Sequence, residues 1–378
     1  MAELKPFRAL RYDPAAAGAP LDQLVAPPYD VIPDEVLQSL AAASEFNIVR
    51  LIRPHEPELA AERFADWQAR GVLVREERPA VWRLEEEFVG PDGVRRTRVG
   101  LVARVRVHPF DEGVVFPHER TFEGPMQMRL RLIRGLRTKV SPVLMLHAGA
   151  SPPVMPGPPQ LEATLGGSTS RLWRIDDPAL VAETIAAVRG PLVIADGHHR
   201  YTASLKHFQE QGTEETAFTM ATLVSREDPG LEIFPTHRLV SVDPPPLPGG
   251  FTEAQLEGDV HACLDRLASA GRDHPAFVRL DGDGAVLAEE RDVEGGTLER
   301  LDVSSLDRLG LEGVGYTAFA DEAVRAVESG DVRAAFLVRA PTIEQVEDVA
   351  TSGLVMPQKS TYFYPKLTTG LLLAPLDE

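Results

Sequence analysis

The chain has 378 residues, which is long for one compact core and predicts two or three lobes. Hydrophobic residues make up 43% and charged residues 25%, as in globular proteins, so the composition argues against disorder. The formal net charge of -18 excludes a general attraction to nucleic acid or to an anionic membrane, and we expect neither as a partner.

The number of cysteines and the lengths of the apolar runs indicate the cellular compartment of the protein. Cys263 is the only cysteine, so no intramolecular disulfide forms, which fits a reducing compartment. The N-terminus lacks a secretory apolar core, and no apolar run approaches the ~20 residues needed to cross a bilayer. We therefore expect a soluble, cytoplasmic α/β enzyme; its oligomeric state is not indicated.

Prolines and apolar periodicity predict the elements of an N-terminal segment, residues 1–79. Residues 25–33 are expected to be extended or turned, because each proline fixes its own φ and disfavours helix before it. Residues 34–43 are typical of a short helix. Residues 57–70 predict a longer helix, because its large apolar side chains recur on one face.

Residues 80–243 are expected to form the core, with mixed sheets. Residues 80–88 and 95–107 predict two strands, joined across the turn signal Gly90-Pro91-Asp92-Gly93. The other expected elements are a helix at 124–138, a strand at 141–146, a loop at 149–167, a strand at 171–175, a helix at 178–189, and strands at 218–225 and 232–240.

A strand, a turn and a helix follow one another at residues 191–195, 196–199 and 200–211. A strand that ends in Asp-Gly and runs into a helix is typical of phosphate sites, since free N–H groups and the helix dipole favour an anion there. Gly197 would let a ligand approach the backbone closely. An ordinary N-cap and tight turn is the alternative interpretation.

The side chains of this turn suit a phosphate ligand. Arg200 offers a planar donor for bidentate contact, and His198 and His199 can donate to phosphate or move protons. Asp196 can orient a histidine or help to hold a magnesium ion. The sequence therefore predicts a ligand site at residues 196–200.

Three further segments carry candidate site residues. His118 and Glu119 precede the arginine-bearing helix, and Glu119 next to a phosphate could act as a general base or could simply cap that helix. His237 and Arg238 lie at a predicted strand. The C-terminal cluster alternates cations and hydroxyls with aromatics, which an amphipathic strand would also show, and its candidates are Lys359, Ser360, Thr361 and Lys366.

The Pro/Gly-rich residues 244–250 predict a linker, after which residues 251–378 form a C-terminal domain. Within that domain, residues 253–270 predict a helix, and residues 276–291 predict a hairpin that turns at Asp-Gly-Asp-Gly.

Six motifs, in this order, resemble the bacterial and archaeal family called domain of unknown function 1015. The resemblance spans the full length and rests on KPFRAL, APPYDV, PHERT, IADGHHRYTASL, FPTHRLV and QKSTYFYPK.

A wider resemblance joins PHE and DGHHR to the superfamily of ParB-type nucleotide-binding domains, sulfiredoxins and free-serine kinases. It implies an α/β (α+β) fold with a ParB/sulfiredoxin-like core and additional N- and C-terminal portions. It also implies that His198, His199 and Arg200 bind the phosphates of a nucleotide such as ADP or ATP, and that Glu119 acts on a substrate hydroxyl.

The leading functional hypothesis is phosphoryl transfer by a kinase or phosphatase on a small hydroxy metabolite, with free serine or phosphoserine as the specific candidate. Positioning and charge neutralisation carry such chemistry, and the chain lacks a GxxxxGK[ST] loop, so any nucleotide site is of another kind. Two alternatives stay open. One is a nucleotide-binding regulatory module without catalysis, and the other is a metal-dependent hydrolase that uses histidines, although no HExxH-like spacing supports it.

Overall fold

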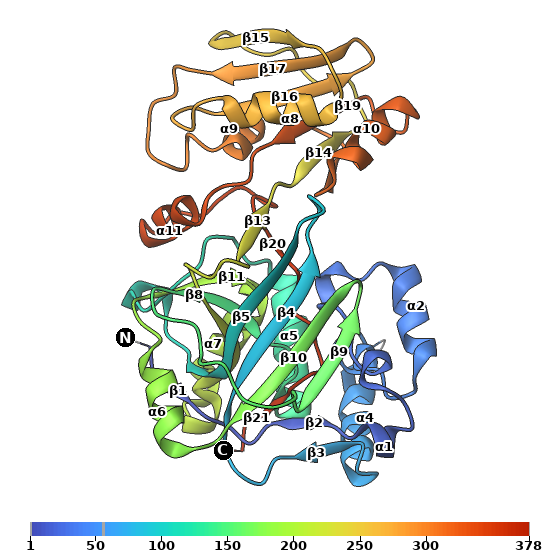
Figure 1. Ribbon diagram of the computed structural model, residues 1–378, viewed down its shortest axis with the longest axis vertical. Coiled ribbons are helices and arrows are strands. Elements are labelled where there is room, and N and C mark those ends of the chain that lie inside the picture. Colours follow the sequence, from blue (N-terminus) through green and yellow to red (C-terminus); the bar gives the residue numbers. More distant parts are fainter. Residues whose placement is uncertain (1, 55–56, 378) are drawn as a thin grey trace. The chain divides into compact units, whose positions relative to one another are not determined.

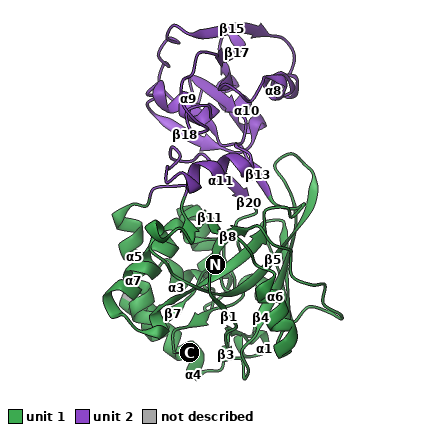
Figure 2. Cartoon of the chain, turned by 90° about the vertical axis from the view of Figure 1, so that its left-hand side faces the viewer, with its two compact units in different colours: residues 1–117, 121–231, 365–378 green, residues 118–120, 232–364 purple. Residues whose placement is uncertain are grey.

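The computed structural model describes residues 2–54 and 57–377 and has mixed α/β architecture, as expected (Figure 1). The chain forms two compact units (Figure 2). Unit 1 comprises residues 1–117, 121–231 and 365–378, and unit 2 comprises residues 118–120 and 232–364.

Backbone pairing explains why these units differ from the segments expected at residues 1–79, 80–243 and 251–378. The N-terminal segment joins the core because β1 pairs with β5. The last residues return to unit 1 because β21 pairs with β7. Residues 244–250 lie inside unit 2, where they connect two strands of its sheet.

Unit 1 is built on a nine-stranded sheet, counted over the described residues, in the order β6-β11-β8-β12-β5-β4-β10-β9, with β1 on β5. β11 is parallel to β6 and antiparallel to β8, while β8 is parallel to β12. The strands are β1 Leu4–Lys5, β4 Val81–Val89, β5 Arg95–Arg106, β6 Val115–Phe116, β8 Val143–His147, β9 Leu161–Leu165, β10 Ser168–Ile175, β11 Leu192–Asp196 and β12 Phe218–Ser225; two small pairs are β2 Leu10–Tyr12 with β3 Leu73–Arg75, and β7 Thr138–Lys139 with β21 Ala374–Pro375.

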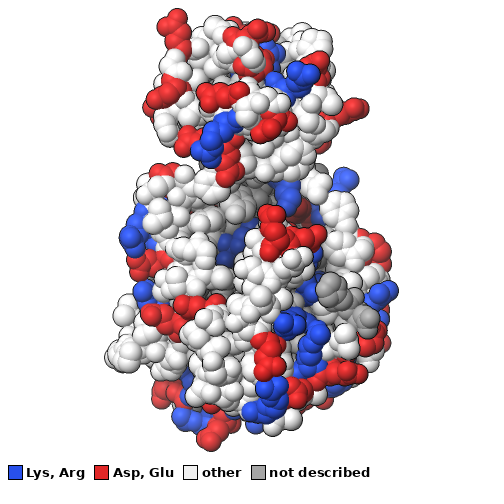
Figure 3. Space-filling model, turned by 90° about the vertical axis from the view of Figure 1, so that its right-hand side faces the viewer, with Lys and Arg blue, Asp and Glu red and all other residues white. Residues whose placement is uncertain are grey.

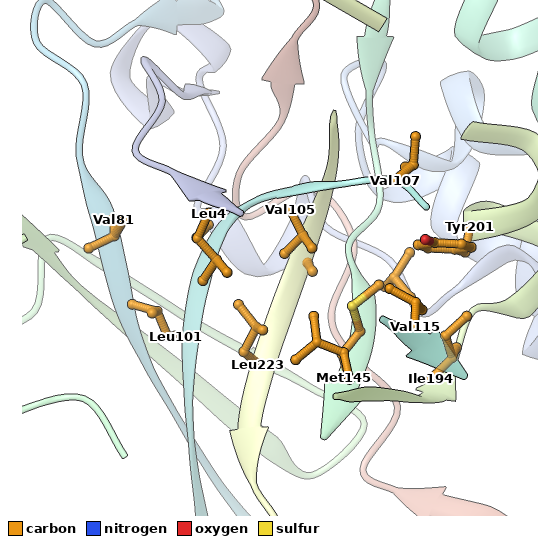
Figure 4. Packing of buried hydrophobic residues seen from close by; sticks show 14 of the residues in the cluster. Leu4, Val81, Leu101, Val105, Val107, Val115, Met145, Ile194, Tyr201 and Leu223 are labelled. Atoms are coloured by element: carbon orange, nitrogen blue, oxygen red, sulfur yellow. The ribbon is translucent and has the colours of Figure 1, made fainter. Parts of the chain in front are cut away.

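The core of unit 1 lies between this sheet and helices α6 and α7. Tyr201 of α7 packs with Met145, Ile194 and Leu223 of the central strands (Figure 4), and Leu205 belongs to the same cluster. These side chains recur at helical spacing on α7 and at alternate positions on the strands, which puts them on one face of each element. The helices of unit 1 are α1 Pro14–Ala17, α2 Asp34–Ala43, α3 Val49–Ile52, α4 Pro57–Ala69, α5 Glu123–Leu136, α6 Pro178–Ala186 and α7 His198–Gln211.

Unit 2 contains a six-stranded sheet, within the described part of the chain, in the order β15-β17-β16-β19-β14-β18. All its pairs are antiparallel, and α8 and α10 cover a core that includes Cys263 and Ala323. The elements are β13 Glu232–Phe234, β14 His237–Val240, β15 Phe251–Leu256, α8 Val260–Ser269, β16 Ala276–Asp281, β17 Gly284–Glu290, α9 Asp302–Arg308, β18 Val314–Thr317, α10 Ala320–Glu328, β19 Ala334–Val338, α11 Ile343–Thr351 and β20 Tyr362–Tyr364.

Many predicted elements are confirmed, including the helix at residues 34–43, the β4–β5 hairpin, the strand at 218–225 and the β16–β17 hairpin. The loop expected at residues 149–167 was wrong at its end, because residues 161–165 form β9, which pairs with β10.

Two other boundaries also differ. The helix expected at residues 253–270 is wrong in its first part, where β15 pairs with β17 before Asp259 caps α8. The strand expected at residues 232–240 is interrupted at Pro235-Thr236 and splits between two sheets, because proline has no N–H for a sheet ladder.

Over residues 2–54 and 57–377, each helix is too short or too polar to cross a bilayer. On the face shown in Figure 3, acidic and basic side chains are interspersed in each unit. That pattern gives no single basic field on this face for a polyanion.

Candidate functional site

The turn between β11 and α7 is shaped by a β-bulge and a glycine. The pairing of β11 with β8 shifts register between Ile194 and Asp196, and bulges of this kind re-aim a strand end. Gly197 has φ of 94°, and a Cβ there would lie 2.8 Å from Nε of Arg200. Only glycine fits this position without strain. The helix consequently begins at His198, two residues earlier than predicted.

Asp196 lies at the end of β11 and is buried. Arg200 donates from Nη2 to Oδ2 of Asp196, and Lys366 donates from Nζ to Oδ1. Burial alone would raise the pKa of the Asp196 carboxyl, but Lys366 and then Arg200 outweigh it and hold that pKa well below its usual range. Asp196 is therefore an ionised anchor for two cations.

Arg200 is buried and makes hydrogen bonds inside the turn. In addition to its bond with Asp196, it donates from Nη1 to the carbonyl oxygen of Pro142. The sequence predicted an arginine that offers its planar edge to a ligand. In the structure, part of that edge holds the end of β11, the start of α7 and the segment before β8 together.

The two histidines of the turn have different surroundings. His198 is buried, whereas His199 is half-buried and accepts a hydrogen bond at Nε2 from the backbone N–H of Phe122, at 2.9 Å. Burial lowers the pKa of the His199 imidazole, although the Asp30 carboxylate opposes this. An acceptor at Nε2 places the proton of the neutral ring on Nδ1.

Two residues of the N-terminal motif APPYDV, which were not among the predicted site residues, lie near this turn. The guanidinium of Arg129 stacks 3.8 Å from the ring centre of Tyr29. The charges of Asp30 and Arg129 act on His199. Tyr29 and Arg129 belong to segments that the sequence analysis had noted for their prolines and arginines. Their sequence pattern alone did not link them to residues 196–200.

Residues 118–120 of the PHERT segment belong to unit 2, where His118 contacts residues of the C-terminal motif. His118 is buried, and its Nε2 lies 2.9 Å from Oγ1 of Thr361. The His118 ring is 6.0 Å from that of Phe363, and the His118 carbonyl accepts a hydrogen bond from the backbone N–H of Met356. Glu119, the candidate base, is half-buried.

His237 and Arg238 are buried within the structure of unit 2. Nδ1 of His237 accepts from the backbone N–H of Val338 at 3.2 Å, and burial lowers the pKa of His237 to about 4. Arg238 donates to the carbonyl oxygens of Thr236 and Lys359, and burial lowers its pKa to about 10. These contacts connect β14 to the C-terminal motif.

The C-terminal motif contributes residues to both units. Lys359 is exposed with φ of 57°, and Ser360 is buried and donates to the Pro357 carbonyl at 2.6 Å. In β20 the two tyrosine side chains share one face and Phe363 is buried on the other, because side chains alternate along a strand. Lys366 belongs to unit 1.

The predicted site residues thus form two groups. The group in unit 1 is Asp196, Gly197, His198, His199, Arg200 and Lys366, and the group in unit 2 is His118, Glu119, His237, Arg238, Lys359, Ser360 and Thr361.

A protein-bound magnesium ion does not fit the environment of Asp196, since both carboxylate oxygens already pair with cations. Over the described residues, no three His, Cys, Asp or Glu side chains are grouped as metal ligands either.

Comparison with family models decides the relationship of the whole chain. The model described as protein of unknown function (DUF1015) matches residues 4–304. The chain belongs to this family. The family resemblance is thereby confirmed over residues 4–304, which contain five of the six motifs; QKSTYFYPK lies outside the match. A search of curated proteins found no match.

Solved structures with similar folds include a mutant free serine kinase in complex with ADP. It is 17% identical, with a TM-score of 0.40, and the match covers 72% of this chain and 92% of that chain. A C-terminally truncated SbnI from Staphylococcus aureus is 13% identical, with a TM-score of 0.39 and coverage of 72% and 87%. A conserved hypothetical protein from Pyrococcus furiosus is 18% identical, with a TM-score of 0.35 and coverage of 72% and 95%.

Proposed function

We propose that this protein is a phosphoryl-transfer enzyme, a kinase or a phosphatase, which acts on a small hydroxy metabolite. Free serine or phosphoserine is the specific candidate. The observation that carries the proposal is the cationic turn at the start of α7, where Arg200 and Lys366 flank one carboxylate, that of Asp196. The first N–H groups of a helix have no partner within it, and with these cations they favour a phosphate.

Phosphoryl transfer asks the protein mainly to position the groups and to neutralise charge. In the kinase direction, the hydroxyl oxygen of the substrate attacks the terminal phosphorus of a nucleotide. The bond to the nucleoside phosphate breaks, and Glu119 takes the hydroxyl proton. In the phosphatase direction, water is the attacking group and the metabolite hydroxyl leaves. Glu119 has this role by its match to the PHE motif.

The nucleotide in this proposal is ADP or ATP, which the sequence resemblance of DGHHR implies. Magnesium, if the reaction uses it, would be held mainly by phosphate oxygens, because the Asp196 carboxylate is already paired. No step is assigned to it.

A second candidate function is a nucleotide-binding regulatory module without catalysis. The pairing of Asp196 with Arg200 favours it, because these two side chains then hold the turn in shape and take no part in bond making. Such a module would bind ADP or ATP as well, so binding alone does not separate the two functions.

A measurement of turnover distinguishes the phosphoryl-transfer enzyme from the regulatory module. The purified protein is incubated with ADP or ATP, serine and magnesium, and phosphoserine is measured by mass spectrometry; the reverse reaction is followed by release of phosphate from phosphoserine. We expect Glu119→Gln to bind ADP like the parent protein and to lose turnover by ~100-fold or more, as for loss of a general base.

Glu123→Gln is the matched control, because Glu123 is an exposed carboxylate in the first turn of α5. It should retain full turnover. ADP binding without transfer in either direction would show that the regulatory module is the correct function. Full activity of Glu119→Gln would remove Glu119 from the mechanism.

A further inference from the structure

A small cavity of about 30 Å³ in unit 1 lies beside α7, between α5 and the segment that contains β7. Three of its lining residues are the cations Arg129, Lys139 and Arg200, and Ser141, Ser204 and Thr219 add hydroxyl groups. Among the described residues that line it, none is acidic. Leu132, Ile133 and Val140 also line the cavity, so its cations and hydroxyls lie among apolar side chains.

Lys139 is the least exposed of these three cations. The residue is only 4% exposed, and its Nζ donates a hydrogen bond of 3.1 Å to Oγ of Ser204. Ser204 in turn donates to the carbonyl of Arg200. Within residues 2–54 and 57–377, no carboxylate pairs with the Lys139 ammonium.

Arg129 is the second buried cation without a carboxylate partner in the described part of the chain. The residue is 7% exposed, and its Nε has no hydrogen-bond acceptor. Its guanidinium rests on the ring of Tyr29, which holds its plane in place but accepts no hydrogen bond in that plane.

Two buried cations without a directly contacting carboxylate are costly to a folded protein, because buried charges are normally paired, although the charge of Asp30 also acts on Arg129. Such an arrangement is expected where a ligand supplies the missing charge. The volume of the cavity limits the size of that ligand. One water position needs roughly 10–15 Å³, so about 30 Å³ accommodates two or three oxygen atoms.

We propose that this cavity is a second anion-binding position and that it takes in two or three oxygens of a phosphate group, either of free phosphate or of the terminal group of a metabolite. The guanidinium of Arg129 and the ammonium of Lys139 neutralise its two charges, and the hydroxyl of Thr219 adds a hydrogen bond. Arg200 lies beside them but is paired with Asp196, and the Ser204 hydroxyl already donates to the Arg200 carbonyl. This inference needs no turnover and does not depend on the role of Glu119.

Isothermal titration of the full chain with inorganic phosphate, sulfate and phosphoserine tests the proposal. We expect saturable binding by the parent protein. Lys139→Met and Arg129→Met should each weaken it by roughly 10- to 100-fold, the loss of one charge-assisted hydrogen bond. Tighter binding of phosphoserine than of free phosphate identifies a metabolite group, and equal binding identifies the free ion.

Arg131→Met is the matched control, because Arg131 lies on the same helix as Arg129 but is exposed. It removes the same charge from the protein and should leave affinity unchanged. Circular dichroism of each variant establishes that it is folded. Folded Lys139→Met that binds all three anions as the parent does would overturn the proposal, and so would absence of binding by the parent. Unchanged binding by Lys139→Met leaves turnover at Glu119 untouched, so that result overturns this proposal alone. Failure of the parent to bind phosphoserine would also count against phosphoserine as the substrate.

Discussion

The ammonium of Lys366 donates a hydrogen bond to Oδ1 of Asp196, although the two residues are 170 positions apart in the chain. Arg200 occupies the other oxygen of the same carboxylate. The last segment of the chain is therefore part of the turn that begins α7. Residues 365–378 belong to unit 1, where β21 pairs with β7.

Replacing Lys366 by methionine should lower the free energy of unfolding at pH 7 by about 2 kcal/mol. Loss of one partner of a buried pair costs about 3–5 kcal/mol, and here Arg200 remains to share the charge. Urea denaturation measures the effect. Lys359→Met is the control, because Lys359 is exposed, and its stability should stay within about 0.5 kcal/mol of the parent.

The same variant should change the response of the protein to acid. The folded pKa of Asp196 is depressed, so its stabilising contribution is present above the unfolded pKa of about 4 and is lost as the pH falls further. Without Lys366 the depression is smaller, and the loss of stability between about pH 4 and pH 2 should be smaller too. An unchanged acid profile would contradict the pairing.

Gly197→Ala should destabilise the protein by about 2–3 kcal/mol, since φ of 94° is strained for alanine and its Cβ would meet Arg200 at 2.8 Å. Gly212→Ala, at the other end of α7, is a matched control. It also has positive φ, 63°, but no atom lies within 4 Å of the added Cβ, so a cost of about 1 kcal/mol is expected. Equal costs in thermal denaturation would mean that Arg200 does not constrain the glycine.

Arg200→Ala should affect the fold and not only ligand binding. The variant leaves the Pro142 carbonyl without this donor and leaves Asp196 with Lys366 alone, so we expect a loss of about 3 kcal/mol. Chemical denaturation checks this. Stability equal to that of the parent would restore the simpler interpretation from sequence, in which Arg200 serves the ligand alone.

Sulfate affinity should fall as the pH rises through about 7. Burial, and then the charge of Arg104, lowers the pKa of Lys139 to about 7, so the ammonium is present below this pH and is lost above it. Anion binding favours the charged form, and each pH unit above 7 should weaken sulfate binding by up to about tenfold. Sulfate keeps the same charge throughout this range, so the change of affinity with pH comes from titration of the protein.

Lys139→Met should remove most of that change of affinity with pH, because the other groups that face Lys139 do not titrate there. Burial lowers the pKa of Arg129 only to about 10 and that of His207 to about 4, so neither group changes its charge near pH 7. In the absence of anion, the variant should be more stable than the parent by about 1 kcal/mol or more at pH 6, because a buried unpaired charge is gone. A less stable variant would indicate that Lys139 supports the fold.

Of the candidate site, the turn itself could be predicted from sequence. An apolar strand followed by Asp-Gly and an amphipathic helix is a local pattern, and backbone propensity suffices to recognise it. The pairing of His118 with Thr361, and of Lys366 with Asp196, depends on contacts between residues far apart in the chain. No local pattern contains that information.

Composition, charge, the helix at residues 34–43, the β4–β5 hairpin and the family motifs were determined by the sequence alone, because each depends on residues close together in the chain. The tertiary structure decided the rest. It placed β9 and β15 in sheets, where pairing with a neighbouring strand outweighs weak local preference. It also brought Arg129 and Lys139 into one cavity, since helix and strand packing, and not their order in the chain, sets which charges meet.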